Sequence, residues 1–197
     1  MFSQATGRLA AAVLVASVSA VAAGAAASPD VPGNIEVTDH VAFFQAHAAG
    51  TQNYVCLPTA TGGVAWKQIS PTATLFVKIF GAPFQAVTHF LSPNPEEPGV
   101  NRATWQHSLD SSRVWAKAIE TSTDAAFVAP GAIPWLKLEV VGRQAGPTGG
   151  RFLAQAKFIQ RIHTAGGSAP ATETCGTTAQ IGAVALVPYT ADYVFFR

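Results

Sequence analysis

The sequence predicts a mainly β, single-domain fold, either a β-sandwich or a barrel-like fold, with little helix and one long-range disulfide. Short apolar segments of strand length recur along most of the chain, and turns that contain Gly, Pro, Asn or Asp separate them. The chain has 197 residues, which suits one large domain, and no linker or fixed-period repeat divides it. Its two cysteines, Cys56 and Cys175, can pair in only one way.

Residues 1–27 have the pattern of a secretory signal peptide. Arg8 is their only charged residue, an apolar run follows it, and three alanines end the segment. That run is shorter than the roughly 20 residues that span a bilayer. We expect cleavage after Ala27, a secreted extracellular protein, and no membrane association afterwards; an uncleaved anchor or an Ala-rich helix is the alternative. Because secretion places thiols in an oxidising compartment, Cys56 and Cys175 are expected to form a disulfide.

An N-terminal lead-in, residues 28–50, precedes the single β-rich domain expected over residues 51–197. Within the lead-in, residues 37–50 predict a short helix that Thr38 or Asp39 could cap and Gly50 could end. Several apolar side chains would share one face of that helix. Because the segment is short, a loop is the alternative.

Strand signals dominate the rest of the chain. Residues 59–63 and 109–112 are turn material between extended runs, and each predicts a hairpin. The segment 92–102 has three prolines, two acidic residues and a glycine, and predicts a surface loop. Residues 152–163 fit a strand or a helix, and the paired glycines on each side favour the strand. A proline within the last run, Pro188, indicates a bulge or an edge position. The expected strands are residues 54–57, 64–69, 75–80, 84–91, 103–107, 113–119, 135–141, 152–163 and 184–196.

The composition excludes several classes of partner. Charged residues make up 12% of the chain and the formal net charge is +1, so the basic stripe of a nucleic-acid-binding protein is missing. Low charge together with 10% aromatic residues also argues against intrinsic disorder. The histidines lack metal-ligand spacing such as His-x-His, and the cysteines lie too far apart in sequence for a zinc motif. We therefore expect no metal and no nucleic-acid partner.

Several short strings along the chain are distinctive when they are taken together. They are Gln52-x-Tyr54-x-Cys56, Thr104-Trp105, Asp110-Ser111-Ser112, Ala132-Ile133-Pro134-Trp135-Leu136, Phe158-Ile159-Gln160-Arg161 and Val187-Pro188-Tyr189-x-Ala191-x-Tyr193. In this order the chain resembles a secreted family of fungi and bacteria, catalogued as domain of unknown function 3455 (DUF3455), over about residues 50–197. The resemblance implies secretion and a compact single domain. It implies no established reaction and therefore no catalytic residues.

Some members of that family carry a malate-dehydrogenase label, which this sequence does not support. A dinucleotide-binding fold needs a Gly-x-Gly-x-x-Gly turn between a strand and a helix, so that the backbone can approach the pyrophosphate. The glycine-rich segment 142–150 has the wrong spacing, Pro147 interrupts it, and no helix is expected after it. We therefore expect no nicotinamide and no other cofactor.

Three residues are candidates for catalysis. His89 or His107 could form an acid–base pair with Asp110 if the fold brings them together, which would suit a secreted hydrolase. The alternative is structural, with Asp110 capping a hairpin turn and His107 on a strand. No Gly-x-Ser-x-Gly elbow is present, and no pair of carboxylates stands out. The sequence favours a protein that is not an enzyme.

Trp105, Trp115 and Arg161 are the candidate ligand-binding residues. The two tryptophans flank a predicted turn and are expected to be exposed, whereas Trp66 and Trp135 are expected in the core. Exposed aromatic faces can stack on sugar rings or phenolic compounds. The alternative is that the aromatic side chains only fill the core.

Gln160 and Arg161 are neighbours on an expected strand, so they point to opposite faces of the sheet. A buried polar group without a partner costs about 1–3 kcal/mol, so whichever side chain points inward must be hydrogen-bonded. Arg161 therefore either pins loop carbonyl groups or anchors a ligand.

The leading functional hypothesis is a non-enzymatic extracellular protein that binds a carbohydrate or a small aromatic ligand in an aromatic-lined cleft. The first alternative is the secreted hydrolase. The second is a cell-wall or surface interaction protein without a small ligand. The sequence does not set the oligomeric state.

Overall fold

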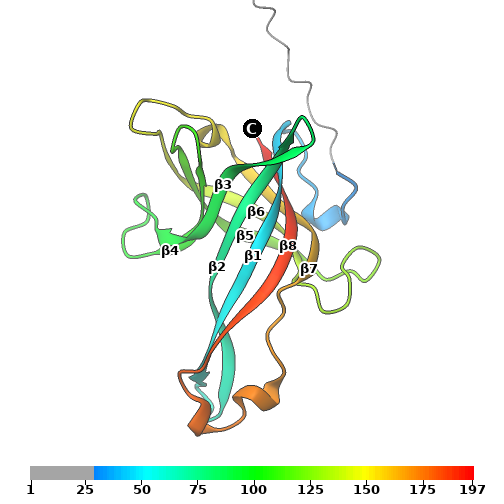
Figure 1. The fold of residues 1–197 in the computed structure, drawn as a ribbon, viewed down its shortest axis with the longest axis vertical. Coiled ribbons are helices and arrows are strands. Elements are labelled where there is room, and N and C mark those ends of the chain that lie inside the picture. The colour runs from blue at the N-terminus through cyan, green and yellow to red at the C-terminus, as the bar shows by residue number, and fades with distance from the viewer. Residues whose placement is uncertain (1–28) are drawn as a thin grey trace, which may run out of the picture.

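The computed structural model describes residues 29–197, which form a closed barrel of antiparallel strands (Figure 1). Each strand pairs with its neighbours in the chain, and β8 closes the barrel against β1. This confirms the mainly β fold and selects the barrel over the sandwich. The expected signal peptide, residues 1–27, lies outside the described residues. The strands are β1 (Ala42–Pro58), β2 (Val64–Ile79), β3 (Ala82–Pro93), β4 (Asn101–His107), β5 (Arg113–Ser122), β6 (Trp135–Gln144), β7 (Phe158–Gly166) and β8 (Val184–Phe196).

The helix expected within residues 37–50 is wrong, because most of that segment is the first half of β1. It pairs with β2 on one side and with β8 on the other. Ala46 and Ala48 are buried in the cluster that fills the barrel, between neighbours that are exposed. Strand pairing on both sides outweighs the local helical pattern, and β8 lies at the other end of the chain, where a local pattern cannot detect it. The domain therefore begins with β1 rather than at residue 51.

The described part of the chain contains helices of the 3₁₀ type only. These are η1 (Gly33–Ile35), η2 (Leu153–Gln155), η3 (Thr172–Cys175) and η4 (Thr178–Gln180). Among residues 29–197, no helix has the length and apolar character needed to cross a membrane.

One end of the barrel is closed by aromatic side chains. The ring of Phe152 packs against the rings of Phe43, Phe44 and His107, with centroids 5.8, 5.2 and 4.5 Å apart. Phe44 lies near the start of β1 and His107 at the end of β4, so both belong to the same end of the antiparallel barrel. These rings pack together in the interior of the barrel at this end.

The strand expected over residues 152–163 begins only at Phe158, because η2 precedes it across the closed end of the barrel. The backbone N–H of Phe152 donates to Asp110 Oδ2 at 2.8 Å, and that of Leu153 donates to Ser112 Oγ at 3.0 Å. These two side chains hold the segment away from the sheet. The backbone N–H groups of Phe152 and Leu153 therefore bond to side chains distant in sequence and not to a neighbouring strand. A local sequence pattern does not predict such partners.

At the opposite end, β1, β2 and β8 continue beyond the barrel as a long ribbon (Figure 1). The Cys56–Cys175 disulfide ties β1 to η3 at the tip of this ribbon, as the sequence predicts. Pro188 lies on β8 just past Gly166–Tyr189, the last pair that β8 forms with β7. One side of β8 is therefore an edge at this point, which confirms the edge position expected for Pro188.

The segment before β1, residues 29–41, packs on the outside of the barrel. Ile35 and Val37 pack with Trp135 and Ile162 in a second buried cluster, outside the wall formed by β7 and β8. Gln160 is buried on this outer face and donates from Nε2 to Ile35 O at 2.7 Å. Trp135 is 3% exposed, which confirms its expected place in a core.

Candidate ligand pocket

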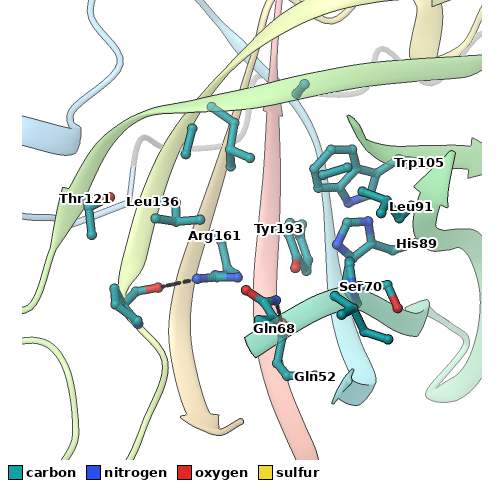
Figure 2. A pocket seen from close by; sticks show the side chains of 17 residues that line it. Gln52, Gln68, Ser70, His89, Leu91, Trp105, Thr121, Leu136, Arg161 and Tyr193 are labelled. Atoms are coloured by element: carbon teal, nitrogen blue, oxygen red, sulfur yellow. Dashed lines mark hydrogen bonds between the residues drawn. The ribbon is translucent and has the colours of Figure 1, made fainter. Parts of the chain in front are cut away.

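A cavity of about 440 Å³ lies inside the barrel, at the end opposite Phe152 (Figure 2). All the strands contribute side chains to it. Four neighbouring strands, β3 to β6, each contribute residues two positions apart, as strand alternation requires for side chains on one face. These pairs are His89 and Leu91, Ala103 and Trp105, Ala116 and Ala118, and Leu136 and Leu138.

The cavity exists because small side chains stand where larger ones would fill the barrel. Ala103, Ala116 and Ala118 line it on two adjacent strands. An eight-stranded barrel is just wide enough for side chains to fill its interior or for one small ligand to occupy it. Three methyl side chains on one part of the wall favour a barrel interior that one small ligand can occupy.

Aromatic side chains form the floor of the cavity. The indole of Trp105 stacks on the imidazole of His89, with ring centroids 4.2 Å apart and planes inclined by 12°. The edge of Trp105 also contacts Tyr193, with centroids 5.6 Å apart. Trp105 is 1% exposed, and its Nε1 has no hydrogen-bond partner within residues 29–197. One indole face is therefore already covered, and an unpartnered donor remains in the wall.

His89 is a neutral side chain in this pocket. Its Nδ1 lies 2.9 Å from the carbonyl oxygen of Thr104, which can only accept, so the ring proton is on Nδ1 and Nε2 has a free lone pair. Burial lowers the pKa of His89 to about 3; the hydrogen bond to Thr104 opposes this shift, and the charge of Arg161 adds to it. His89 can therefore accept a hydrogen bond through Nε2 at neutral pH.

Arg161 lines the cavity from β7 and also pins a loop. Its Nε and Nη2 donate to the carbonyl oxygen of Pro134 at 3.2 and 2.8 Å (Figure 2). The side chain of Arg161 points into the barrel and that of Gln160 points outward to Ile35. This confirms that the two residues lie on opposite faces of the sheet. The structure thus shows that Arg161 holds the loop through Pro134 O. The role of Arg161 as a ligand anchor stays a prediction.

The guanidinium is the dominant charge of the pocket. None of the lining residues that the structure describes is Asp or Glu. Burial raises the pKa of Tyr193, and the positive charge of Arg161 acts against that shift. The same charge acts in the same sense on Tyr54 and Tyr189, whose pKa values burial also raises. A positive charge without a carboxylate partner therefore faces the cavity.

Gln52 is a pocket residue that the sequence analysis missed. It is fully buried, its Oε1 accepts from Gln68 Nε2, and its own Nε2 has no partner among the described residues. Gln52 follows Ala46, Ala48 and Gly50 at every second position of β1, so it shares their face of the strand. That alternation is the sequence pattern that predicts an inward side chain for Gln52. Tyr193 was missed as well, in a similar series on β8.

Trp115 does not line the pocket, although the sequence predicts both Trp105 and Trp115 as ligand-binding residues. Trp105 pairs with Val114 across the hairpin, and Trp115 pairs with Thr104, so the two indoles lie on opposite faces of the sheet. Trp115 is 3% exposed and donates from Nε1 to Ser92 Oγ at 2.9 Å on the outer face. The expectation that both tryptophans are exposed is wrong, because Trp115 is buried on the outer face of the sheet and the barrel encloses Trp105.

Trp66, expected in the core, is only partly buried. It lies on the ribbon beyond the barrel, where its Nε1 donates to Thr174 Oγ1 at 3.0 Å. This part of β2 extends beyond the barrel (Figure 1), so the face of the strand that carries Trp66 does not border the barrel interior.

The structure brings His107 and Asp110 together but leaves His89 apart from them. His107 Nδ1 lies 2.9 Å from Asp110 Oδ1 at the closed end, whereas His89 bonds to Thr104 in the pocket. Burial by itself raises the pKa of Asp110, but hydrogen bonds from Phe152, Ser112 and His107 bring it well below its usual range. Asp110 is thus a structural acceptor for the hairpin and η2, and the three-residue site of the hydrolase alternative is not assembled.

Other histidines form contacts on the outer wall. His47 Nδ1 and His163 Nδ1 lie 2.8 and 2.9 Å from the two carboxylate oxygens of Asp192. Within residues 29–197, no three His, Cys, Asp or Glu side chains are arranged to hold a metal ion.

Comparison with known proteins gives a family and no function. The family model described as "Protein of unknown function (DUF3455)" matches residues 37–197, which include the whole barrel. Neither the curated proteins nor the solved structures include a significant match to the chain.

Proposed function

This chain belongs to the DUF3455 family of unknown function, and we propose that it is a secreted protein that binds one small, largely apolar organic molecule inside its barrel. The observation that carries this proposal is the cavity of about 440 Å³ at one end of a barrel whose other end is closed. Small-molecule sites commonly have volumes of about 300–1,000 Å³ and mostly apolar walls with a few polar groups. The pocket matches that description in size and in lining.

A protein that did not use this space would be more stable if it filled it. An empty apolar cavity forfeits the dispersion contacts of its lining, and the loss of stability grows with its volume. The small side chains of Ala103, Ala116 and Ala118 leave such unfilled space along the same part of the wall. A bound ligand would restore them, which supports a binding function over an incidental void.

The pocket favours a compact organic molecule over a sugar. Stacking on a sugar ring needs an open aromatic face, and one face of Trp105 is covered by His89 while the side chain is 1% exposed. The remaining wall is mainly aliphatic. We therefore narrow the ligand from a carbohydrate or small aromatic compound to a small molecule with an apolar body.

Secretion is part of this proposal. The pattern of residues 1–27 supports export, and the Cys56–Cys175 disulfide suits an oxidising compartment. The secreted chain would begin at Ser28, shortly before the residues, Ile35 and Val37, that pack on the outside of the barrel.

The test is a thermal-shift screen of the secreted chain against small aliphatic and aromatic compounds, with oligosaccharides as the competing class. A ligand at about 100 times its Kd stabilises a protein by about 2.7 kcal/mol, or roughly 5–10 °C for a chain of this size. We expect such shifts with apolar compounds and none with oligosaccharides. A folded protein whose Tm no apolar compound raises would overturn the proposal.

A matched pair of variants ties the shift to the barrel interior. Ala118→Phe places a ring in the mouth of the cavity and should abolish the shift. Ile119→Phe changes the next residue of β5, which is 40% exposed and does not line the cavity, and should leave the shift unchanged. Equal shifts in both variants would mean that the compounds bind elsewhere.

A further inference from the structure

We propose that the ligand of this pocket is an organic monocarboxylate, whose carboxylate binds Arg161 while its apolar body occupies the alanine-lined space. This inference rests on the proposed small-molecule function and specifies the chemical class of the ligand. Three features of the described residues support it, and each concerns a different part of the pocket.

The first feature is the unused capacity of Arg161. A guanidinium has five N–H donors, and the two bonds to Pro134 O use Nε–H and one hydrogen on Nη2. No Asp or Glu forms an ion pair with Arg161 within residues 29–197. The bonds to Pro134 also fix the plane of the guanidinium, so that its remaining N–H groups are preorganised for a planar acceptor.

The second feature is an excess of donors around the cavity. Gln52 Nε2 and Trp105 Nε1 belong to lining residues that are at most 1% exposed, and neither atom has a partner in the described part of the chain. Figure 2 shows that Gln52, Tyr193 and Arg161 all belong to the lining of this cavity. A buried donor without a partner is unfavourable, and acceptor oxygens would satisfy it. A carboxylate supplies two such oxygens and one negative charge.

The third feature is the balance between one cation and a mostly apolar wall. Leu91, Leu136 and Leu138 join the alanines in lining the cavity, and the pocket contains one arginine and no lysine. A single guanidinium matches a single carboxylate, whereas a phosphate monoester would bring a second charge into this apolar space without a partner. A hydrocarbon or aryl body then buries itself against the leucines and alanines.

The experiment changes the ligand head group and leaves the protein intact. Isothermal titration of the secreted chain would use three bodies, decyl, 4-phenylbutyl and 3-(indol-3-yl)propyl, each as the carboxylate, the alcohol and the ammonium compound. We expect the carboxylate of at least one body to bind about tenfold more tightly than its alcohol, with the ammonium compound weakest.

The outcomes separate this inference from the function on which it rests. Alcohols that bind as tightly as their carboxylates would overturn the monocarboxylate assignment and leave the small-molecule function standing. If no compound binds with any head group, both proposals fail. Tighter binding of the ammonium series would also contradict the role of Arg161.

Two arginine variants locate the head group. Arg161→Gln should weaken carboxylate binding about tenfold to the level of the alcohol, and should leave alcohol binding unchanged. Arg143→Gln is the matched control, because Arg143 also donates to a backbone carbonyl, Ala156 O at 3.1 Å, but does not line the cavity. If Arg161→Gln does not fold because the pin to Pro134 is lost, the head-group series on the unmodified protein decides the question.

Discussion

The imidazole of His89 lies against the indole of Trp105 with ring centroids 4.2 Å apart, and together they form the floor of the cavity inside the barrel. The imidazole also donates to Thr104 O, which fixes its orientation. Because burial lowers the pKa of His89 to about 3, this floor is uncharged at neutral pH. A ligand of the proposed class would therefore meet a neutral aromatic surface there, and the charge of the pocket is confined to Arg161.

This neutral histidine makes the stability of the protein depend on pH. The folded pKa of about 3 is lower than the unfolded value near 6.5, so the unfolded chain binds a proton that the folded chain rejects between these values. Stability should fall as the pH decreases from 7 to 5, by about 2 kcal/mol from this residue alone. Urea unfolding at both pH values measures the difference.

His89→Asn provides the control for that prediction. Asn places its amide N–H where Nδ1 lies and can still donate to Thr104 O, but it does not titrate. The variant should lose about 2 kcal/mol less than the unmodified protein between pH 7 and 5. Identical losses in the two proteins would show that His89 does not cause the pH dependence.

Asp110→Asn should destabilise the closed end of the barrel. Asp110 accepts hydrogen bonds from His107, from the N–H of Phe152, and from the N–H and hydroxyl of Ser112. The amide group of Asn offers one acceptor oxygen and turns an N–H toward the donors, so we expect a loss of about 2 kcal/mol in the free energy of unfolding. Denaturant unfolding measures this loss, and ligand-induced shifts should persist because the cavity is at the other end.

Asp124→Asn is the comparison for this variant. Asp124 also accepts from a backbone N–H, that of Ala126, but in an exposed contact, and its replacement should change stability by less than about 0.5 kcal/mol. If the two variants lose the same stability, Asp110 does not hold the closed end in the way described.

Removal of the disulfide should lower stability without emptying the pocket. Cys56 and Cys175 are 119 residues apart, and cross-links of native domains stabilise them by about 2–5 kcal/mol. The double variant Cys56→Ala/Cys175→Ala should lose an amount in this range in urea unfolding. Since the bond lies at the tip of the ribbon, the ligand-induced thermal shift should remain. Loss of that shift in a folded double variant would contradict the separation of ribbon and pocket.

Gly50→Ala should disrupt the pairing of β1 with β2. A Cβ at Gly50 would overlap the backbone of Thr72 and Ala73, which cannot move without shifting the strand. We expect a loss of about 1–3 kcal/mol, which thermal and urea unfolding would detect. Gly33→Ala is the control, because a Cβ there would meet no atom within 4 Å. Equal stability of the two variants would show that β1 and β2 do not approach closely at Gly50.

Local patterns predicted the elements whose partners are close in sequence. The hairpin around residues 109–112 joins β4 and β5, and residues 59–63 join β1 and β2, as expected. Each turn is decided by residues a few positions apart, so the sequence contains the whole signal. The same holds for the opposite directions of Gln160 and Arg161, which follow from strand alternation alone.

The sequence by itself determined that this chain is mainly β, that it forms one domain, that Cys56 and Cys175 are paired, and that Arg161 and Gln160 lie on opposite faces. Only the tertiary structure decided which face is the interior. A strand has two equivalent faces until the sheet closes, and closure depends on the pairing of β1 with β8 from opposite ends of the chain. That closure turned residues 42–50 into a strand, sent Trp115 outward and Trp105 inward, and placed His89, Gln52 and Arg161 around one cavity.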